Sequence, residues 1–224
     1  MHMRNKQTTL TPFEAQAFYD RLGKKQDTQG FYENPALDDL IAHAAFHNAQ
    51  KVFEFGCGTG KFASRLLEEH LSSSAIYLGC DVSPTMITLA AQRLSPYPER
   101  AKVVRSDGSI RIPLRDHSVD HVVSNYVLDL LSEEDILLFF SEAHRVLIPG
   151  GELCLVSLTK GNTFLSKLVS SIWMAIFRIR PSLVGGCHPI LLKSYLDQEH
   201  WRLEYQKVVT PFGVPSEVFI LIKR

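Results

Sequence analysis

The sequence has no excess of charge of either sign, because 24 Lys and Arg residues balance 24 Asp and Glu residues. A protein that binds nucleic acid mainly through the phosphates needs a positive field, and a neutral chain does not provide one. We therefore do not expect nucleic acid as the main partner.

Long apolar runs and paired cysteines are also missing. The longest apolar stretch, residues 168–177, contains two serines and is half as long as the ~20 residues that a membrane-spanning helix needs. The four cysteines form no C-x-x-C pair, and most of them fall in or beside apparent strands, as small buried hydrophobes do. Residues 1–10 lack the apolar core of a secretory signal. These absences predict a soluble, cytoplasmic protein with reduced thiols and no membrane span.

What is present from residue 51 onward is an alternation of short apolar runs with helical patterns. This rhythm is typical of βαβ units and a mostly parallel sheet. The last two expected strands follow each other directly, which favours an antiparallel pair at a sheet edge. Strands are expected at residues 51–55, 75–80, 102–105, 121–124, 152–158, 202–209 and 217–222. Helices are expected at residues 12–22, 35–47, 61–71, 84–94, 133–147, 164–179 and 190–196.

A glycine-rich turn follows the first expected strand. Gly56, Gly58 and Gly60 form a G-x-G-x-G pattern, in which side chains would block the approach of a ligand to the backbone. Asp81 ends the second strand, at the spacing of a carboxylate that accepts hydrogen bonds from ribose hydroxyls. Glu54 precedes the first glycine by two residues, where a carboxylate would repel a pyrophosphate but tolerates a sulfonium and an α-ammonium. The turn therefore favours S-adenosylmethionine over a nicotinamide dinucleotide.

Five segments in order resemble the motifs of class I S-adenosylmethionine-dependent methyltransferases. Residues 52–60 look like the first motif and residues 81–86 like the second, and residues 106–108 stand where the adenine-contacting acidic residue lies. Residues 118–125 resemble the fourth-strand motif, and residues 142–151 resemble the turn into the fifth strand. The resemblance implies a Rossmann-like α/β fold: a seven-stranded, mostly parallel sheet with an antiparallel edge strand, helices on both faces and N-terminal helices.

We expect one methyltransferase domain over residues 1–224. Its expected parts are an N-terminal helical cap at 1–48, a cofactor-binding core at 51–158, a substrate-side insertion at 159–200 and closing strands at 201–224.

The resemblance implies roles at the methionine end of the cofactor. Glu54 would lie near the methionine part, and the backbone carbonyl of Ser124 or Asn125 would receive the α-ammonium. In the family an N-terminal tyrosine often covers this end, so Tyr19 or Tyr32 is expected to do so, although either could equally be a helix residue packed on the core.

At the nucleoside end, the resemblance places Asp81 on the ribose and Asp107 with Gly108 at the adenine. The expected cofactor-binding residues are Tyr19, Glu54, Gly56, Cys57, Gly58, Gly60, Asp81, Val82, Met86, Asp107, Gly108, Ser124 and Asn125.

Methyl transfer from a sulfonium is an in-line displacement, so alignment is the main task of the protein and a general base is optional. Candidates for an acceptor-side base or contact are Tyr126, Asp129 and His188, in loops expected near the open side of the cofactor. Asp129 could instead begin a helix, and His188 follows two glycines that permit an unusual turn. No His, Cys, Asp and Glu spacing supports a metal site.

The sequence thus predicts a methyltransferase that uses S-adenosylmethionine and an unidentified, small and partly apolar acceptor. Two alternatives stay open: a protein that binds the cofactor without catalysis, and an NAD(P)-dependent oxidoreductase. The sequence also leaves open whether the protein forms a homodimer.

Apolar residues at helical spacing mark the stretch at 164–179, with Lys167, Arg178 and Arg180 at its polar face or ends. Three roles are open: packing against the sheet or a partner subunit, peripheral contact with an anionic membrane surface, and a lid over the acceptor. The place favours the lid, because this stretch leaves the carboxyl end of the fifth strand. The apolar residues concerned are Phe164, Leu165, Leu168, Ile172, Trp173, Ile176 and Phe177.

Overall fold

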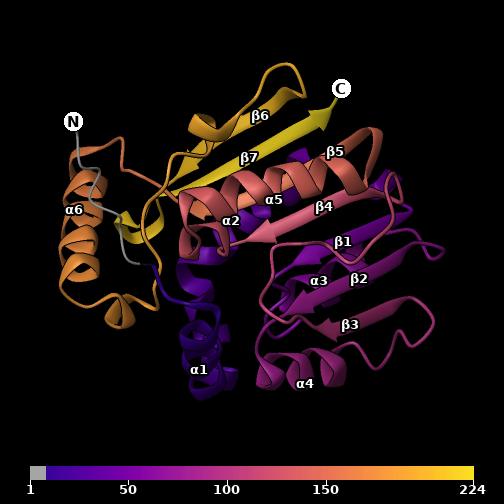
Figure 1. Ribbon diagram of the computed structural model, residues 1–224, viewed down its shortest axis with the longest axis horizontal. Helices are drawn as coiled ribbons and strands as arrows, with labels where there is room; N and C mark the ends of the chain where they lie inside the picture. The colour runs from indigo at the N-terminus through magenta and orange to yellow at the C-terminus, as the bar shows by residue number, and fades with distance from the viewer. Residues whose placement is uncertain (1–8) are drawn as a thin grey trace.

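The computed structural model describes residues 9–224, apart from the side chain of residue 182, and is built on one seven-stranded sheet (Figure 1). The strand order is β3-β2-β1-β4-β5-β7-β6. Strands β1 to β5 pair in parallel, whereas β7 is antiparallel to both β5 and β6. The predicted fold, with its antiparallel pair at one edge, is confirmed. The strands are β1 (Lys51–Phe55), β2 (Ile76–Asp81), β3 (Ala101–Arg105), β4 (Val119–Asn125), β5 (Leu147–Leu158), β6 (Trp201–Val209) and β7 (Ser216–Lys223).

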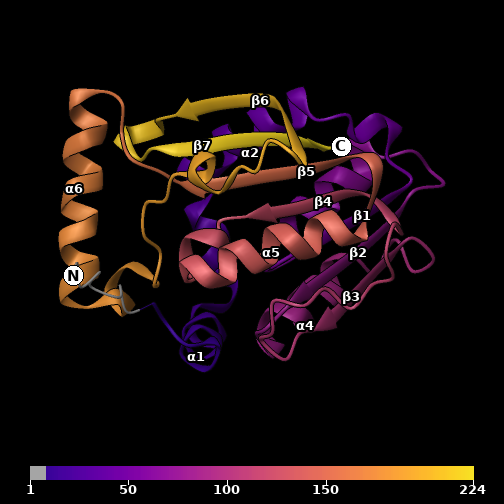
Figure 2. The same cartoon turned by 45° about the horizontal axis from the view of Figure 1, so that its top comes forward.

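Helices cover both faces of this sheet, and Figures 1 and 2 show α5 in front of it and α2 behind it. Helix α6 stands apart, beyond the end of the sheet at which β4 terminates. The helices are α1 (Pro12–Leu22), α2 (Gly30–His43), α3 (Lys61–Arg65), α4 (Pro84–Arg93), α5 (Glu133–Val146) and α6 (Phe164–Ile179). Short helical turns are η1 (Gly23–Gln29), η2 (Phe46–Asn48), η3 (Leu66–His70), η4 (Leu128–Leu130), η5 (Pro181–Val184), η6 (Leu192–Tyr195) and η7 (Pro211–Gly213).

The sheet separates two apolar cores, because successive side chains of a strand point to opposite faces. Val52 of β1 and Cys154 of β5 join the core under α2, α3 and α4, whereas Phe53 and Leu155 join the core under α5. Strands buried on both faces read as continuous apolar runs, which is why the sequence locates them well.

Several element boundaries differ from the sequence prediction. Helix α2 begins at Gly30 and contains Pro35, because the η1 turn leads directly into it. Helix α5 ends at Val146, where the backbone becomes extended, so the Pro-Gly-Gly segment at 149–151 lies within β5 and does not stop the helix. The expected helix at 190–196 is only the short turn η6. Within residues 9–224, no helix is both long and apolar enough to cross a membrane.

Candidate cofactor-binding site

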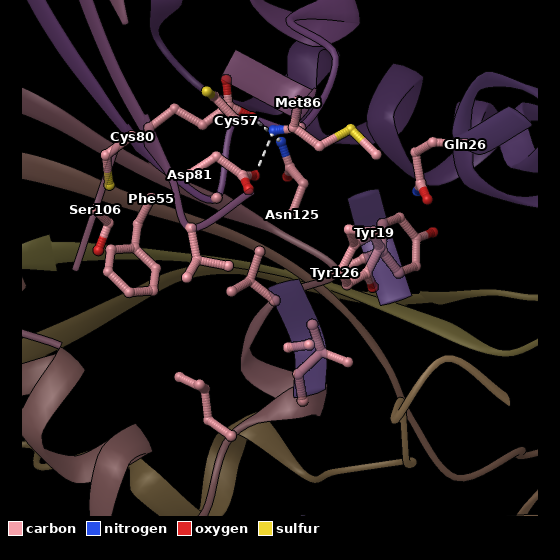
Figure 3. Close-up of a pocket in the computed structure, with 18 of the residues that line it drawn as sticks. Tyr19, Gln26, Phe55, Cys57, Cys80, Asp81, Met86, Ser106, Asn125 and Tyr126 are labelled. Atoms are coloured by element: carbon pink, nitrogen blue, oxygen red, sulfur yellow. Dashed lines mark hydrogen bonds between the residues drawn. The ribbon is translucent and has the colours of Figure 1, made fainter. Parts of the chain in front are cut away.

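A cavity of about 500 Å³ lies at the carboxyl ends of β1, β2 and β4, within the ~300–1,000 Å³ range of small-molecule sites. The strand order reverses between β1 and β4, which is where open α/β sheets bind their ligands. Loops after these strands form one part of the wall, and the N-terminal segment forms another. Figure 3 shows Phe55, Cys80 and Ser106 on one side of the cavity and Tyr19 and Tyr126 on the other.

The three glycines of the turn after β1 have different tasks. A Cβ on Gly56 would lie 2.3 Å from Val127 Cγ2, and one on Gly60 would lie 3.0 Å from the Cα of Ala90 in α4. These two glycines permit close packing of the turn. A Cβ on Gly58 would meet nothing within 4 Å, although its φ of +51° favours glycine. Gly58 therefore keeps the cavity clear of side chains.

Glu54 is a buried carboxyl group in the cavity wall. The Tyr77 hydroxyl donates to its Oε2 at 2.5 Å, and Asn125 Nδ2 donates to its Oε1 at 3.4 Å. Burial raises the pKa of Glu54 to about 7, because the charged form loses hydration that two neutral donors replace only in part. The buried Oδ1 of Asn125 has no hydrogen-bond partner within residues 9–224. Glu54 and Asn125 therefore present hydrogen-bond acceptors to the cavity, and no cationic side chain of residues 9–224 donates to them.

Asp81 fastens the end of β2 to the glycine turn. Its Oδ2 accepts the N–H of Gly58 at 2.9 Å, and its Oδ1 accepts the N–H of Ser83 at 2.9 Å. Its carboxylate lies beside the cavity (Figure 3), and burial raises its pKa in spite of these hydrogen bonds. Each carboxylate oxygen can accept more than one hydrogen bond, so the position is compatible with a ribose hydroxyl as a further donor.

Contacts that sequence reasoning missed hold the N-terminal segment against the site. Asp20 of α1 accepts a hydrogen bond from the Ser83 hydroxyl at 2.6 Å, at the start of α4. Asp27 of η1 accepts hydrogen bonds at 2.6 Å from the Thr59 hydroxyl of the glycine turn and from Arg93. No local pattern announces these bonds, because the partners are 32 to 66 residues apart.

The N-terminal segment also supplies Tyr19 and Glu33 to the cavity wall. Tyr32, the other expected tyrosine, is buried and packs edge-on against Tyr126, with ring centroids 5.8 Å apart. Burial raises the pKa of Glu33 to about 7. Sequence reasoning missed Glu33, because a lone glutamate in a helix is usually a solvated surface group.

The structure brings most of the expected cofactor-binding residues to this cavity, whereas their binding roles stay predictions. Asp107 lies outside the wall: its exposed carboxylate accepts the N–H of Ser109 at 2.9 Å. Ser124 is buried beneath the wall and donates from its hydroxyl to the carbonyl of Phe55. Gly60 packs on α4 instead of lining the cavity. The wall contains Tyr19, Glu54, Gly56, Cys57, Gly58, Asp81, Val82, Met86, Gly108 and Asn125.

Of the three acceptor-side candidates, only Tyr126 lies in the wall. Its hydroxyl donates to Ser216 Oγ at 2.9 Å, and burial raises its pKa. Asp129 and His188 are buried behind the wall, where the N–H of His188 donates to the carbonyl of Asp129 at 2.9 Å. Burial raises the pKa of Asp129 to about 7, and its Oδ1 has no partner among the described residues.

The insertion at 159–200 does not form a wall of this cavity, in contrast to the predicted lid. The reason is that α6 stands beyond the sheet (Figure 1). Phe177 of α6 is buried, but five of its apolar side chains are exposed: Phe164, Leu165, Leu168, Ile172 and Ile179. Within residues 9–224, no group of three His, Cys, Asp or Glu side chains is placed to hold a metal ion.

The parallel sheet, the glycine turn and the two acidic residues define a Rossmann-like cofactor-binding fold, and comparison with known proteins identifies its family. Residues 53–155 match the family described as "Methyltransferase domain". A malonyl-(acyl-carrier protein) O-methyltransferase of Marinomonas sp. is 30% identical over 145 residues, which are 64% of this chain and 51% of that protein. A tRNA N(3)-methylcytidine methyltransferase of Drosophila melanogaster is 28% identical over 126 residues, 55% of this chain and 39% of that protein.

The crystal structure of the (4+2)-cyclase SpnF has the same fold, with a TM-score of 0.68 and 14% identity over 97% of this chain and 98% of that one. The chain spans about half or less of the length of the two curated relatives. The matched segment and these relatives support a class I S-adenosylmethionine-dependent methyltransferase domain at residues 53–155, and members of this family use S-adenosylmethionine as the methyl donor. This confirms the predicted family. Because one of the relatives acts on tRNA, the expectation that nucleic acid is not the main partner stays a prediction.

Proposed function

We propose that the protein binds S-adenosylmethionine in this cavity and transfers the methyl group to a small, partly apolar acceptor. The observation that carries the proposal is the pair Glu54 and Asn125. A buried carboxyl group with a pKa of about 7 lies beside a buried amide oxygen without a donor. The α-ammonium of S-adenosylmethionine would supply both the missing positive charge and the missing N–H donors.

The same pair argues against an NAD(P)-dependent oxidoreductase. A pyrophosphate at the glycine turn would meet Glu54 and Asp81, two acidic groups already raised in pKa by burial. Bringing further negative charge into this site would cost several kcal/mol at the low effective dielectric of a partly buried cleft, on the order of 4 kcal/mol per close pair.

Apolar side chains in the cavity wall support an acceptor with apolar bulk. Leucines line it from both the N-terminal segment and the loop before α5, among them Leu10, Leu37, Leu130 and Leu131. The neutral chain as a whole also favours a small molecule over nucleic acid. The four unpaired cysteines fit our proposal that residues 1–224 work as one domain in the cytoplasm.

Bound S-adenosylmethionine supplies an electrophilic methyl group, and the side chains of this chain align it and control protons. Glu33 is our candidate for the group that accepts a proton from the acceptor, because a pKa near 7 suits a general base at neutral pH. Tyr126 is less suited as a base, since burial raises its pKa and its hydroxyl is engaged by Ser216. We assign Tyr19 and Tyr126 to the positioning of the two substrates.

The test is calorimetry with S-adenosylmethionine and with NADP, followed by incubation of the protein with methyl-labelled cofactor and fractionated cell extract. We expect binding of S-adenosylmethionine alone, and formation of S-adenosylhomocysteine with the fraction that holds the acceptor. Binding without S-adenosylhomocysteine from any fraction would assign the chain to the class that binds the cofactor without catalysis.

A pair of variants connects this activity with the cavity. Asp81→Asn should weaken binding of S-adenosylmethionine about 10- to 150-fold, the equivalent of roughly 1.5–3 kcal/mol for hydrogen bonds to a charged group. Asp197→Asn, at an exposed position outside the wall, is the matched control and should bind within about threefold of the wild type. Equal binding by both variants would remove the ribose contact from Asp81.

A further inference from the structure

Helix α6 differs from an ordinary surface helix, which turns its one apolar side to the protein, because it carries apolar side chains on both its inward and its outward face. On the inward side Val169, Trp173 and Ile176 are half-buried. Two of its three buried residues are serines, Ser166 and Ser170, and the third is Phe177. Both serine hydroxyls hydrogen-bond within the helix and its N-cap, to the carbonyls of Thr163 and Lys167. The inward face of α6 is therefore partly polar and satisfies its own hydrogen bonds.

The outward face of α6 is apolar. Phe164 and Ile179, near its two ends, are 87% and 83% exposed, and the side chains of Leu165, Leu168 and Ile172 between them are also exposed. Scattered exposed apolar residues are normal, but a row of them along one helix marks a surface that binds something.

Phe212 in η7 extends this row. Its side chain is 78% exposed. Its backbone has a φ of 51°, a conformation that bulky residues rarely adopt. The neighbouring Gly213 packs so closely on α6 that a Cβ there would lie 3.3 Å from Leu165 Cγ. The strained turn thus leaves next to α6 an exposed aromatic ring, which packs edge-on against the exposed Phe31 of α2 with ring centroids 5.6 Å apart. We call Phe164, Leu165, Leu168, Ile172, Ile179 and Phe212 the docking surface.

The charge around the docking surface has one sign. No Asp or Glu occurs between Glu152 and Asp197 in a chain that is neutral overall. Lys160, Lys167, Arg178 and Arg180 lie in this interval and are exposed, and none of the four has a carboxylate within ion-pair distance among the described residues. An apolar row bordered by unpaired cations matches an anionic lipid surface.

We propose that the docking surface binds the face of an anionic lipid bilayer. The apolar side chains would enter the boundary between headgroups and acyl chains, while the lysines and arginines contact lipid phosphates. A second copy of the chain fits this surface less well, because a two-fold interface sets identical patches face to face and would bring these cations together.

The proposal stands independently of the reaction, but it places the cavity next to the bilayer. The turn that follows α6 packs on the cavity wall: a Cβ on Gly186 would lie 2.5 Å from Leu10 and 3.4 Å from Leu130. In Figures 1 and 2, α6 and α1 both lie toward the side of the molecule at which β4 terminates.

The test is co-sedimentation of the full chain with vesicles of phosphatidylcholine, with and without phosphatidylglycerol. We expect binding to the anionic vesicles that weakens with added salt, and at least about tenfold weaker binding to phosphatidylcholine alone. Ile172→Glu should lower binding to anionic vesicles at least about tenfold, because it removes one apolar side chain that would enter the bilayer and adds a negative charge. Lys167→Ala should lower it about fivefold, the equivalent of ~1 kcal/mol per basic residue.

Leu137→Glu is the matched control, since Leu137 is an exposed apolar residue of α5 away from the docking surface. It should bind vesicles like the wild type, and the melting temperatures of all variants show whether the fold is intact. Equal binding to both kinds of vesicle, or binding that Ile172→Glu leaves unchanged, would overturn the proposal. So would a dimer that Ile172→Glu abolishes in a protein that binds no vesicles, because the surface would then belong to a second copy.

Discussion

The cofactor cavity and helix α6 use polar side chains in opposite ways. At the cavity, Glu54 bonds to Tyr77 and Asp27 bonds to Arg93, so that polar contacts connect distant parts of the chain. In α6, Ser166 bonds to the N-cap Thr163, and Ser170 bonds to Lys167 of its own helix and to the N–H of Gly161 just before it. A network of long-range bonds makes a site with fixed geometry, whereas local bonds leave a helix that depends on few tertiary contacts.

The contacts that anchor α6 are correspondingly sparse. Trp173 donates its indole N–H to the carbonyl of Cys187 at 2.9 Å, and the ring of Phe177 packs on His188 with centroids 4.9 Å apart. The comparison teaches that apolar spacing alone does not tell which face of a helix is buried. Changes at the cavity should therefore alter cofactor binding strongly, and changes on the outer face of α6 should not.

The largest effect is expected from Gly58→Val. Its side chain would enter the space that Gly58 leaves open, and we expect cofactor affinity to fall at least about a hundredfold, near 3 kcal/mol. Calorimetry measures the affinity. Gly150→Val is the control, because Gly150 also has a positive φ of 78° and open space around it but lies within β5, outside the cavity wall. If both valines weaken cofactor binding equally, backbone strain and not occlusion is the cause.

An intermediate effect is expected from pH. The pKa of Glu54 in the free protein is about 7, above its ordinary value near 4.5, so its contribution to folding stability is full below pH 4.5 and lost as pH rises through 7. A cationic ligand needs the ionised form. Its affinity should therefore fall up to about tenfold for each pH unit below 7 and level off above it.

Calorimetry between pH 5.5 and 8 measures this dependence, and Glu54→Gln should bind weakly with little change over that range. Glu33 also has a pKa of about 7, so Glu33→Gln serves as the control and should keep the pH dependence. A pH profile that persists in Glu54→Gln but disappears in Glu33→Gln would move the cationic end of the cofactor to Glu33.

The smallest effect is expected on the outer face of α6. Leu168→Ser replaces an exposed side chain, so the free energy of unfolding should change by less than about 0.5 kcal/mol and cofactor affinity by less than about threefold. Urea unfolding and calorimetry measure the two quantities. A loss of several kcal/mol would mean that Leu168 is buried in solution, and the contrast between the two regions would then fail.

The sequence by itself determined the sheet and the cofactor turn of this protein. Strands buried on both faces are continuous apolar runs. Glu54 and Asp81 lie at the ends of β1 and β2, and the glycines follow β1 directly. These features are local, so a pattern of a few residues is enough to predict them.

Only the tertiary structure decided that Asp27 and Glu33 reach the cavity, that Asp129 and His188 lie behind its wall, and that α6 faces outward. Helical spacing predicts an apolar stripe on α6. Which face of the helix is buried depends on the residues from elsewhere in the chain that pack against it. Here Trp173 contacts Cys187 and Phe177 packs on His188, so this side of α6 faces the protein. Leu168 and Ile172 lie on the opposite side and are exposed. Burial is a property of the assembled chain, because it is set by neighbours that are distant in sequence.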